Sequence, residues 1–582
     1  MIKSINPRVL LAVVFSVFLF VACSKDEEEV AVSTALSSDD TLLQYIPADS
    51  PYVFASITPL SDELMDKLEP KIERVLQSYQ TVLREAVRAK SEHSSDEIDE
   101  EDMERITAVV DELGSLLSIE GMRNAGLGRE STAAIYGNGI LPVIRFELTD
   151  GALFDAAIDS LEDEAGHELE VAELGGHKYR YLEAEELRVI VAVLGNQGVI
   201  TVVPSKFTDA QTSQALGLTL PQSNIAESGR LQSIATEYGY TDYFVGYMDF
   251  AAIVERFLGG ASGLDADLMA LMEHDAADLS DVCKAEIRSV ASIAPRMVMG
   301  YNDVSLDSIA SSVVLELRDD IASGLQGLSA DVPGLGVDHG GLMSFGMSID
   351  VMAVREFVEA RLDALEAEPF ECEHFAELQA GVAGGREALN RPVPPMVYDF
   401  KGFLAVVTDI EGLDIASQTP PTSVDGSFML AMNNAQALVS LGTMFSPELA
   451  ALNLQADGKP VALELPQMQA MGIDAYAALS DDAIAISIGE GAETDLEGLL
   501  SADVADPAPF LSFSMDAARY YGFLADAIAA GEVASEDSAT PEMQAAMQEI
   551  MQAVAEIYGR MSVGVHFTER GVEIDSTVTL KD

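Results

Sequence analysis

Leu187–Val203 reads LRVIVAVLGNQGVITVV, and this stretch decides the fold class. Two runs of β-branched and other apolar residues flank Gly195-Asn196-Gln197-Gly198, which is a strong signal for a tight turn. The C-terminal end of the chain has the same character: Met561, Val563, Val565 and Phe567 alternate with small or polar residues, and Val572–Leu580 returns after Glu569-Arg570-Gly571. Alternation with a period of two predicts antiparallel strands with one face buried and the other in water.

A second element recurs along the chain: an apolar strand, then an Asp, Asn or Ser that caps an amphipathic helix. A capping side chain accepts a hydrogen bond from the first free helical N–H groups, so we interpret these positions as structural. The expected strands are Tyr52–Ile57, Val143–Leu148, Tyr243–Met248, Leu342–Ile349, Phe428–Met432 and Phe510–Met515, and the caps are Ser61, Asp150, Asp249, Asp350, Asn433 or Asn434, and Asp516. We therefore predict an α+β fold of repeated strand-helix-hairpin units that form largely antiparallel sheets, with helices covering one face.

Three long helices are expected in addition. Ser61–Lys90 and Glu100–Leu117 predict a helical hairpin around the acidic turn Ser91–Asp99, and Thr540-Pro541-Glu542 predicts the start of another helix that ends before Gly559. Methionines form stripes at Met543, Met547 and Met551 and at Met343, Met347 and Met352. Such stripes fit an adaptable groove for a hydrophobic guest or ordinary core packing, and we favour the core.

Composition excludes one large class of function. Among 582 residues there are 33 Lys and Arg against 97 Asp and Glu, a formal net charge of -64. Nucleic-acid binding needs clustered cations, which this surface does not supply, so no nucleic-acid partner is expected. Because 48% of the residues are hydrophobic, the chain is too apolar for a disordered acidic protein and is expected to fold around real cores.

The first residues carry an export signal. Lys3 and Arg8 precede an apolar run, Val9–Ala22, which is too short to span a membrane and fits the apolar part of a signal peptide. Phe20-Val21-Ala22-Cys23-Ser24 resembles the lipobox of bacterial lipoproteins, although Phe20 stands where Leu is usual. The resemblance implies cleavage before Cys23, lipidation of its sulfur and amino group with palmitate-type chains, and, because Ser24 rather than Asp follows, sorting to the outer membrane. An ordinary secretory signal that happens to end near a cysteine is the alternative.

The rest of the chain divides into a tether and two lobes. Residues 1–22 form the predicted signal peptide and residues 23–39 an acidic, aperiodic tether, which would hold the body on the order of 20 Å from the bilayer. We expect an N-terminal α+β lobe at residues 40–332, which contains the helical hairpin, and a C-terminal α+β lobe at residues 333–582. The boundary is placed at the Gly-rich segment Val332–Gly341.

Two stretches carry a second resemblance. Tyr45–Ile57 and Ala133–Asp150 resemble an uncharacterised family of proteobacterial envelope lipoproteins, in which a segment such as Pro47-Ala48-Asp49-Ser50 leads into the first strand. The resemblance covers about the first quarter of the chain after the signal peptide. It supports an envelope location and implies no reaction, ligand or catalytic residue.

Most signatures of enzymes are missing from the sequence. We find no G-x-S-x-G elbow, no phosphate-binding loop of the G-x-x-x-x-G-K-[ST] type and no H-E-x-x-H. His339 beside Asp338 and His374 near Cys372 are the only histidines next to other potential ligands, and isolated pairs of this kind are usually surface residues. We therefore expect no catalytic residue, no metal site and no cofactor.

The function expected from these observations is that of a non-enzymatic, lipid-anchored binding or scaffold protein that faces the periplasm. Its expected partners are the membrane, through the anchor, and an envelope protein or a hydrophobic ligand. A carrier or chaperone of hydrophobic cargo is the alternative, and an envelope hydrolase is less favoured, because an active site of dispersed carboxylates would escape detection in so acidic a sequence.

The remaining cysteines, Cys283 and Cys372, are predicted to form a disulfide. Lipidation of Cys23 leaves an even pair, and the expected compartment is oxidising. Each lies in a predicted helix, on either side of the lobe boundary, so the bridge would join the lobes or pin two helices. Two buried, inert thiols are the alternative.

The anchor is tested by Cys23→Ala. We expect this variant to incorporate no radiolabelled palmitate. After membranes are solubilised in detergent and the phases are separated, it should partition into the aqueous phase, because it carries neither an acylated sulfur nor an acylated amino group. The unchanged chain, expressed in parallel, is the control. Undiminished labelling of the variant would refute lipidation at this residue.

Overall fold

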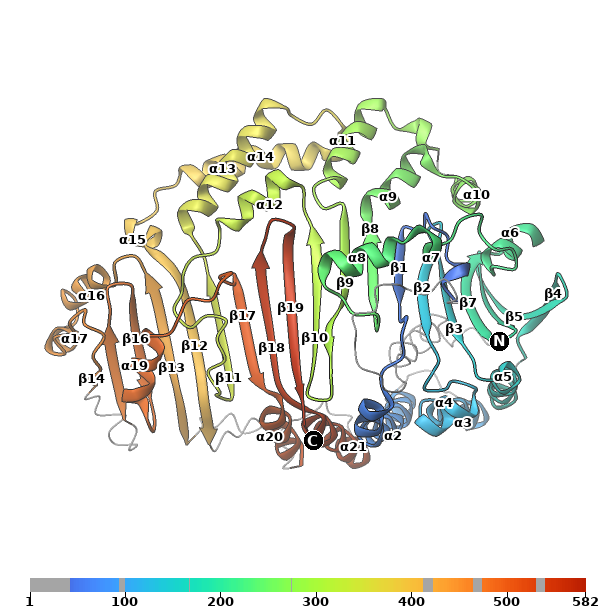
Figure 1. Ribbon diagram of the computed structural model, residues 1–582, viewed down its shortest axis with the longest axis horizontal. Coiled ribbons are helices and arrows are strands. Elements are labelled where there is room, and N and C mark those ends of the chain that lie inside the picture. Colours follow the sequence, from blue (N-terminus) through green and yellow to red (C-terminus); the bar gives the residue numbers. More distant parts are fainter. Residues whose placement is uncertain are drawn as a thin grey trace.

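A computed structural model of the chain describes residues 42–93, 100–166, 168–273, 275–411, 422–463, 474–529 and 540–581. Within these ranges the strands form one 19-stranded sheet in which every strand pairing is antiparallel (Figure 1). The predicted α+β class is confirmed. Two runs of consecutive strands, β1–β10 and β11–β19, make up this sheet.

The first run occupies residues 42–326. Its strands are β1 (Tyr52–Ala55), β2 (Ala133–Asn138), β3 (Leu141–Glu147), β4 (Glu170–Leu174), β5 (His177–Ala184), β6 (Leu187–Leu194), β7 (Gln197–Pro204), β8 (Val245–Asp249), β9 (Arg296–Val304) and β10 (Ser308–Glu316). Its helices are η1 (Leu43–Tyr45), α2 (Asp62–His93), α3 (Glu100–Leu116), α4 (Ile119–Asn124), α5 (Gly151–Ala165), α6 (Asp209–Ala215), α7 (Ile225–Ser228), α8 (Arg230–Tyr238), α9 (Phe250–Glu255), η2 (Arg256–Gly260), α10 (Leu264–Leu271), η3 (Ala276–Asp278), α11 (Asp281–Ala291) and α12 (Asp319–Gln326).

The second run occupies residues 343–580. Its strands are β11 (Met343–Ser348), β12 (Phe400–Glu411), β13 (Ser423–Met432), β14 (Val461–Ala462), β15 (Ala475–Leu479), β16 (Ala483–Ile488), β17 (Leu511–Asp516), β18 (Tyr558–Phe567) and β19 (Gly571–Leu580). Its helices are α13 (Val351–Ala367), η4 (Glu373–Phe375), α14 (Ala376–Asn390), α15 (Pro395–Tyr398), α16 (Ala435–Thr443), α17 (Pro447–Ala451), α19 (Ala492–Leu500), α20 (Ala517–Ala529) and α21 (Pro541–Ile557).

The local sequence signals are confirmed. Each predicted helix start has its cap: the side chains of Ser61, Asp150, Asp249, Asp350, Asn434 and Asp516 accept hydrogen bonds from backbone N–H groups two or three residues ahead. Both predicted hairpins form, as β6–β7 and β18–β19. The predicted helical hairpin is α2–α3, although α2 continues to His93 and residues 94–99 of its predicted tip lie outside the described residues.

The two runs have the same order of strands. Across the sheet the first run reads β4-β5-β6-β7-β3-β2-β1-β8-β9-β10, and the second reads β14-β15-β16-β13-β12-β11-β17-β18-β19. When β4 is set aside, each strand of one run has a counterpart of the same rank in the other. The last strands, β10 and β19, pair antiparallel from Ser308↔Thr579 to Glu316↔Gly571, which joins the runs edge to edge. The predicted boundary at residues 332–341 therefore falls between two parts of one sheet.

Helices gather mainly along the two ends of the strands. In Figure 1, α9–α14 lie along one end, and α2–α4, α20 and α21 along the other. One face of the sheet, here called the packed face, is covered in the first run by η1 and α6–α8, which bury Val53, Tyr136 and Tyr247 completely or almost so. In the second run the same face is covered by Val332, Leu335 and α19.

Arg145 is the largest side chain fully buried under the packed face. Its Nη1 donates to Gln197 Oε1 at 2.6 Å and its Nη2 to the carbonyl of Leu216 at 2.7 Å. The guanidinium also lies 3.9 Å from the ring centroid of Tyr45, a cation–π contact. It neighbours Tyr136, whose pKa is raised by burial. Arg145 thus ties β3 to β7, to the end of α6 and to η1.

Arg145→Ala tests this anchor. We expect the free energy of unfolding to fall by about 3 to 5 kcal/mol, because the buried oxygens of Gln197 and Leu216 lose their donor and the Tyr45 ring loses its cation. Arg84→Ala is the matched control: Arg84 is 47% exposed and pairs with the exposed Asp111, so we expect a change within about 0.5 kcal/mol. Equal losses in denaturant titrations of the two variants would contradict the account.

Candidate functional site

The face opposite the packed face carries large apolar side chains that the described chain leaves accessible. We call it the open face. Directly paired residues of an antiparallel sheet point to the same side, so the registers define its members. They are Met248, Met297, Met299, Tyr301, Ile309, Ser311, Val313, Leu315, Val572, Ile574, Ser576, Val578, Met561, Val563, Val565, Phe567, Leu511, Phe513, Met515, Met343, Phe345, Met347, Phe403, Ala405, Val407, Phe428, Leu430, Ile484, Ile486 and Ile488.

These side chains are exposed or half-buried, with the exception of Met515. Phe345, Phe428 and Ile486 are 41%, 47% and 43% exposed, although each lies within a strand that has neighbours on both sides. The rings of Phe345, Phe403 and Phe428 form a row, with centroids 5.7 and 6.0 Å apart. The open face crosses ten neighbouring strands, roughly 40 Å at about 4.8 Å per strand, and its members include no charged residue.

The second run shows why the large side chains point to the open face. On β11 they alternate with Ser344, Gly346 and Ser348, and these small residues are the buried ones. Ser348 donates to the carbonyl of Pro509 at 2.7 Å, and a Cβ at Gly346 would lie 2.6 Å from Leu335. Close packing of residues 328–337 therefore requires small side chains on the packed side of β11. Our expectation that the apolar side of an alternating strand is the buried side is wrong for β11.

Each end of the open face is closed by the chain itself. Over the first run, α4 and α5 cover it with the cluster around Phe146, Leu148 and Phe154. Over the second run, α16 and α17 pack beside Leu430 and Ile484. The two edge strands are short, and β4 carries Glu170 and Glu173. Short, charged edges do not favour pairing with a further strand, so the open face rather than an edge is the candidate binding surface.

The opposite side of the central strands is polar. There Ser562, Thr577 and Asp575 are exposed, and His566 Nε2 lies 3.8 Å from Asp575 Oδ2. Partial desolvation of its carboxylate by the surrounding sheet raises the pKa of Asp575, with His566 lowering it and Glu573 raising it to lesser extents. Among the described residues, the buried Nδ1 of His566 has no hydrogen-bond partner. In the described part of the chain, His566 therefore makes no hydrogen bond through Nδ1 to a hydroxyl or thiol group.

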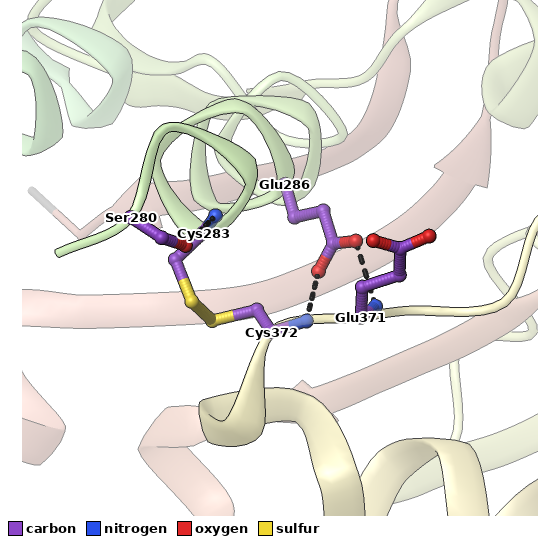
Figure 2. Close-up of a disulfide and its surroundings, with 5 residues drawn as sticks. All are labelled: Ser280, Cys283, Glu286, Glu371 and Cys372. Carbon is purple, nitrogen blue, oxygen red and sulfur yellow. Dashed lines mark hydrogen bonds between the residues drawn. A yellow bond between two sulfur atoms is a disulfide. The ribbon is translucent and has the colours of Figure 1, made fainter.

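Cys283 and Cys372 form the predicted disulfide, with their Cα atoms 4.7 Å apart (Figure 2). Cys283 lies in α11 as expected. The prediction of a helix at Cys372 is wrong, because Pro369 follows the end of α13 and Cys372 is the extended residue before η4. Glu286 Oε1 and Oε2 accept hydrogen bonds from the backbone N–H groups of Glu371, at 2.8 Å, and Cys372, at 3.0 Å. Both cysteines are buried.

This disulfide has a counterpart at the other end of the strands. It joins α11, which follows β8, to the segment after β11, so it links the two runs. At the opposite end α2, which follows β1, packs on α21, which follows β17. Arg74 of α2 bonds to Glu549 and Glu556 of α21, above an apolar contact that includes Leu64, Leu68 and Ile557. The β10–β19 junction is thus held at both ends.

The structure places the other candidate residues as follows. Cys23 lies outside the described residues. His339 bonds through Nε2 to the carbonyl of Gly334, and Asp338 pairs with Arg560. Met343 and Met347 are on the open face, Met352 is 43% exposed on α13, and the stripe of α21 lies in a helix packed between α2 and α20. No group of three metal-ligating side chains, and no helix able to span a membrane, occurs in the described part of the chain.

Comparison with known proteins adds no relative. No family model matches the chain, and neither the curated proteins nor the solved structures include a significant match. In the sequence, one pattern could have indicated the open face: Met343, Phe345 and Met347 alternate with Ser and Gly. We favoured core packing for Met343 and Met347, whereas both lie half-buried on the open face.

The disulfide is tested by Cys283→Ala/Cys372→Ala. Because the bridge closes a loop across a sequence separation of 89 residues, we expect its loss to lower the free energy of unfolding by about 4 to 5 kcal/mol. The control is reductant, which should destabilise the unchanged chain by a similar amount and leave the double variant unaffected. Alkylation of both cysteines in unreduced, denatured protein would refute the bridge.

Proposed function

We propose that this protein is a lipid-anchored, periplasm-facing binding protein of the bacterial outer membrane, without enzymatic activity, that holds the acyl chains of envelope lipids on its open face. The observation that carries the proposal is the uncharged apolar surface across ten strands. Contiguous exposed apolar patches of a few hundred Å² or more mark binding surfaces in soluble proteins. The lipobox at Phe20–Ser24 supports the anchor and its location.

Hydrogen bonding favours acyl chains over an extended peptide. The backbone groups of the central strands are already paired within the sheet, so the open face offers almost no donor or acceptor. An extended polypeptide laid on it would leave its own N–H and C=O groups without partners on that side, at a cost of a few kcal/mol for each group that water cannot reach. Acyl chains carry no such groups, and Met and Phe side chains adapt to their shape.

The charge of the chain restricts which lipid headgroups it can bind. The net charge of -64 repels anionic headgroups, whereas uncharged and zwitterionic headgroups carry no net charge and are not repelled. We therefore propose a zwitterionic phospholipid as the ligand. This develops the carrier alternative of the sequence analysis, and the exposed apolar face favours it over a scaffold for another protein.

We propose further that the two runs are internal repeats. Their identical strand order, the antiparallel β10–β19 junction and the equivalent positions of the disulfide and the α2–α21 contact support a duplicated unit. Duplication would make one open face from two smaller ones, long enough for several acyl chains.

The proposal is tested with Phe345→Ser/Phe428→Ser/Ile486→Ser. In the chain that begins at residue 24, we expect the apparent affinity for the uncharged fluorophore N-phenyl-1-naphthylamine to fall roughly 10-fold, because three exposed apolar contacts are lost. Folding should change little, since the three side chains already meet water.

The matched control is Leu220→Ser/Met272→Ser/Val504→Ser. These apolar residues are 54%, 60% and 41% exposed and lie outside the strands. We expect unchanged fluorophore binding in the control. In an assay of transfer of pyrene-labelled phosphatidylethanolamine from vesicles, the open-face variant should again be impaired and the control should again behave like the unchanged chain. Equal losses in the two triple variants, or none in either, would count against the open face as the binding surface.

A further inference from the structure

A pocket of about 450 Å³ lies where the open face ends between α15 and α16. Its lining is formed by Pro394, Pro395, Met396, Met432, Ala437, Leu438 and Leu441, with Asp399 and Asn434 as the only polar residues. Met432 continues the row of Phe428 and Leu430 along β13, so the pocket adjoins the open face. Its size and its mostly apolar lining can accommodate an alkyl chain, and most of the lining residues remain exposed to water.

The same place in the first run is filled. There α4 precedes β2 and α5 follows β3, as α15 precedes β12 and α16 follows β13. Met122 of α4, Phe154 of α5 and Leu148 pack together, and Leu148 stands two residues before its helix cap, as Met432 does. The first run thus fills with its own side chains the space that the second run leaves open to a ligand.

The helices around the pocket explain why it stays open. α15 is a single turn that begins at Pro395, after Pro392 and Pro394. Residues that precede a proline favour an extended backbone, so the segment before α15 is not helical and no long helix packs against α16 there. At the other end α16 is followed by Met444 and Phe445, the most exposed large apolar side chains in the described part of the chain, at 77% and 81%. This corner of the molecule is therefore suited to a hydrophobic guest.

The carboxylate of Asp399 favours a ligand with a positive charge. It lines the pocket, and no cation pairs with it among the described residues, because Lys401, two residues along β12, pairs with Asp482. The lining contains no Lys, Arg or His. A carboxylate beside an apolar wall attracts a cation and repels a fatty acid, and the net charge of the chain acts in the same direction.

We propose that the pocket between α15 and α16 binds the alkyl chain of a cationic amphiphile, with its ammonium group against the carboxylate of Asp399. This site goes beyond the proposed function: its ligand is cationic and single-chained, and its occupation does not require lipid on the open face.

The experiment uses the full chain in phosphatidylcholine nanodiscs and a dodecylamine that carries a photoreactive diazirine in its alkyl chain. We expect cross-links on α15 and α16, and competition by unlabelled dodecylamine at lower concentration than by dodecanol. Dodecanoate should not compete. Cross-links confined to the open face would overturn this proposal while supporting the binding of acyl chains there. Cross-links confined to α15 and α16 would support this proposal, and the proposed binding of phospholipid to the open face would still be tested separately by the serine variants.

Three variants sharpen the test. Ala437→Trp fills the pocket from α16 and should reduce labelling of α15 and α16 at least 10-fold, whereas Gln436→Trp, exposed on the same helix and outside the lining, should leave it unchanged. Asp399→Asn should weaken competition by dodecylamine about 10-fold and leave that by dodecanol unaltered. Equal labelling in the two Trp variants would refute the pocket, and equal weakening of both competitors by Asp399→Asn would refute the ammonium contact.

Discussion

The antiparallel pairing of β10 with β19 is the interaction on which the rest of the structure depends. It joins the last strands of two similarly ordered runs along nine residue pairs and makes one sheet of them. Contacts at both ends of the strands hold this junction: the Cys283–Cys372 disulfide at one end and the packing of α2 on α21 at the other. These restraints hold the two runs as one continuous sheet, so that their apolar sides form a single surface.

The open face follows from a second constraint, the close packing of residues 328–337 and α19 on the other side of the second run. On β11 and β16 that packing leaves room only for small side chains, such as Ser344, Gly346 and Ala485, whereas β12 and β13 also bury Leu404 and Met429 there. Since side chains alternate along a strand, the large residues of β11 and β16 then point away from the core. The apolar surface therefore follows from the alternation of large and small residues along these strands.

Local features were predictable from sequence because they depend on neighbouring residues. Helix caps such as Asp150 and Asp350, the turn at Gly195-Asn196 and the two hairpins need only a few adjacent side chains. The disulfide was predicted from the number of cysteines and from the oxidising compartment that the sequence led us to expect. Other features depend on residues far apart in the chain: the order of strands, the β10–β19 junction and the identity of the buried face. The buried side of β11, for example, depends on the close packing of the Leu335 side chain against Gly346. Alternation on β11 shows two faces and cannot say which one the chain will cover.

The account rests on the claim that acyl chains reach the open face and not the polar side of the same strands. The most direct measurement is photo-cross-linking of the full chain in lipid bilayers with a phosphatidylethanolamine that carries a diazirine in its acyl chain, followed by mapping of the modified residues. The account predicts adducts on Phe345, Phe513, Val563 and Ile574, and none on Asp575, Thr577 or Ser562, which lie on the same or neighbouring strands and point to the opposite side. Adducts distributed equally over both sets of residues would contradict it.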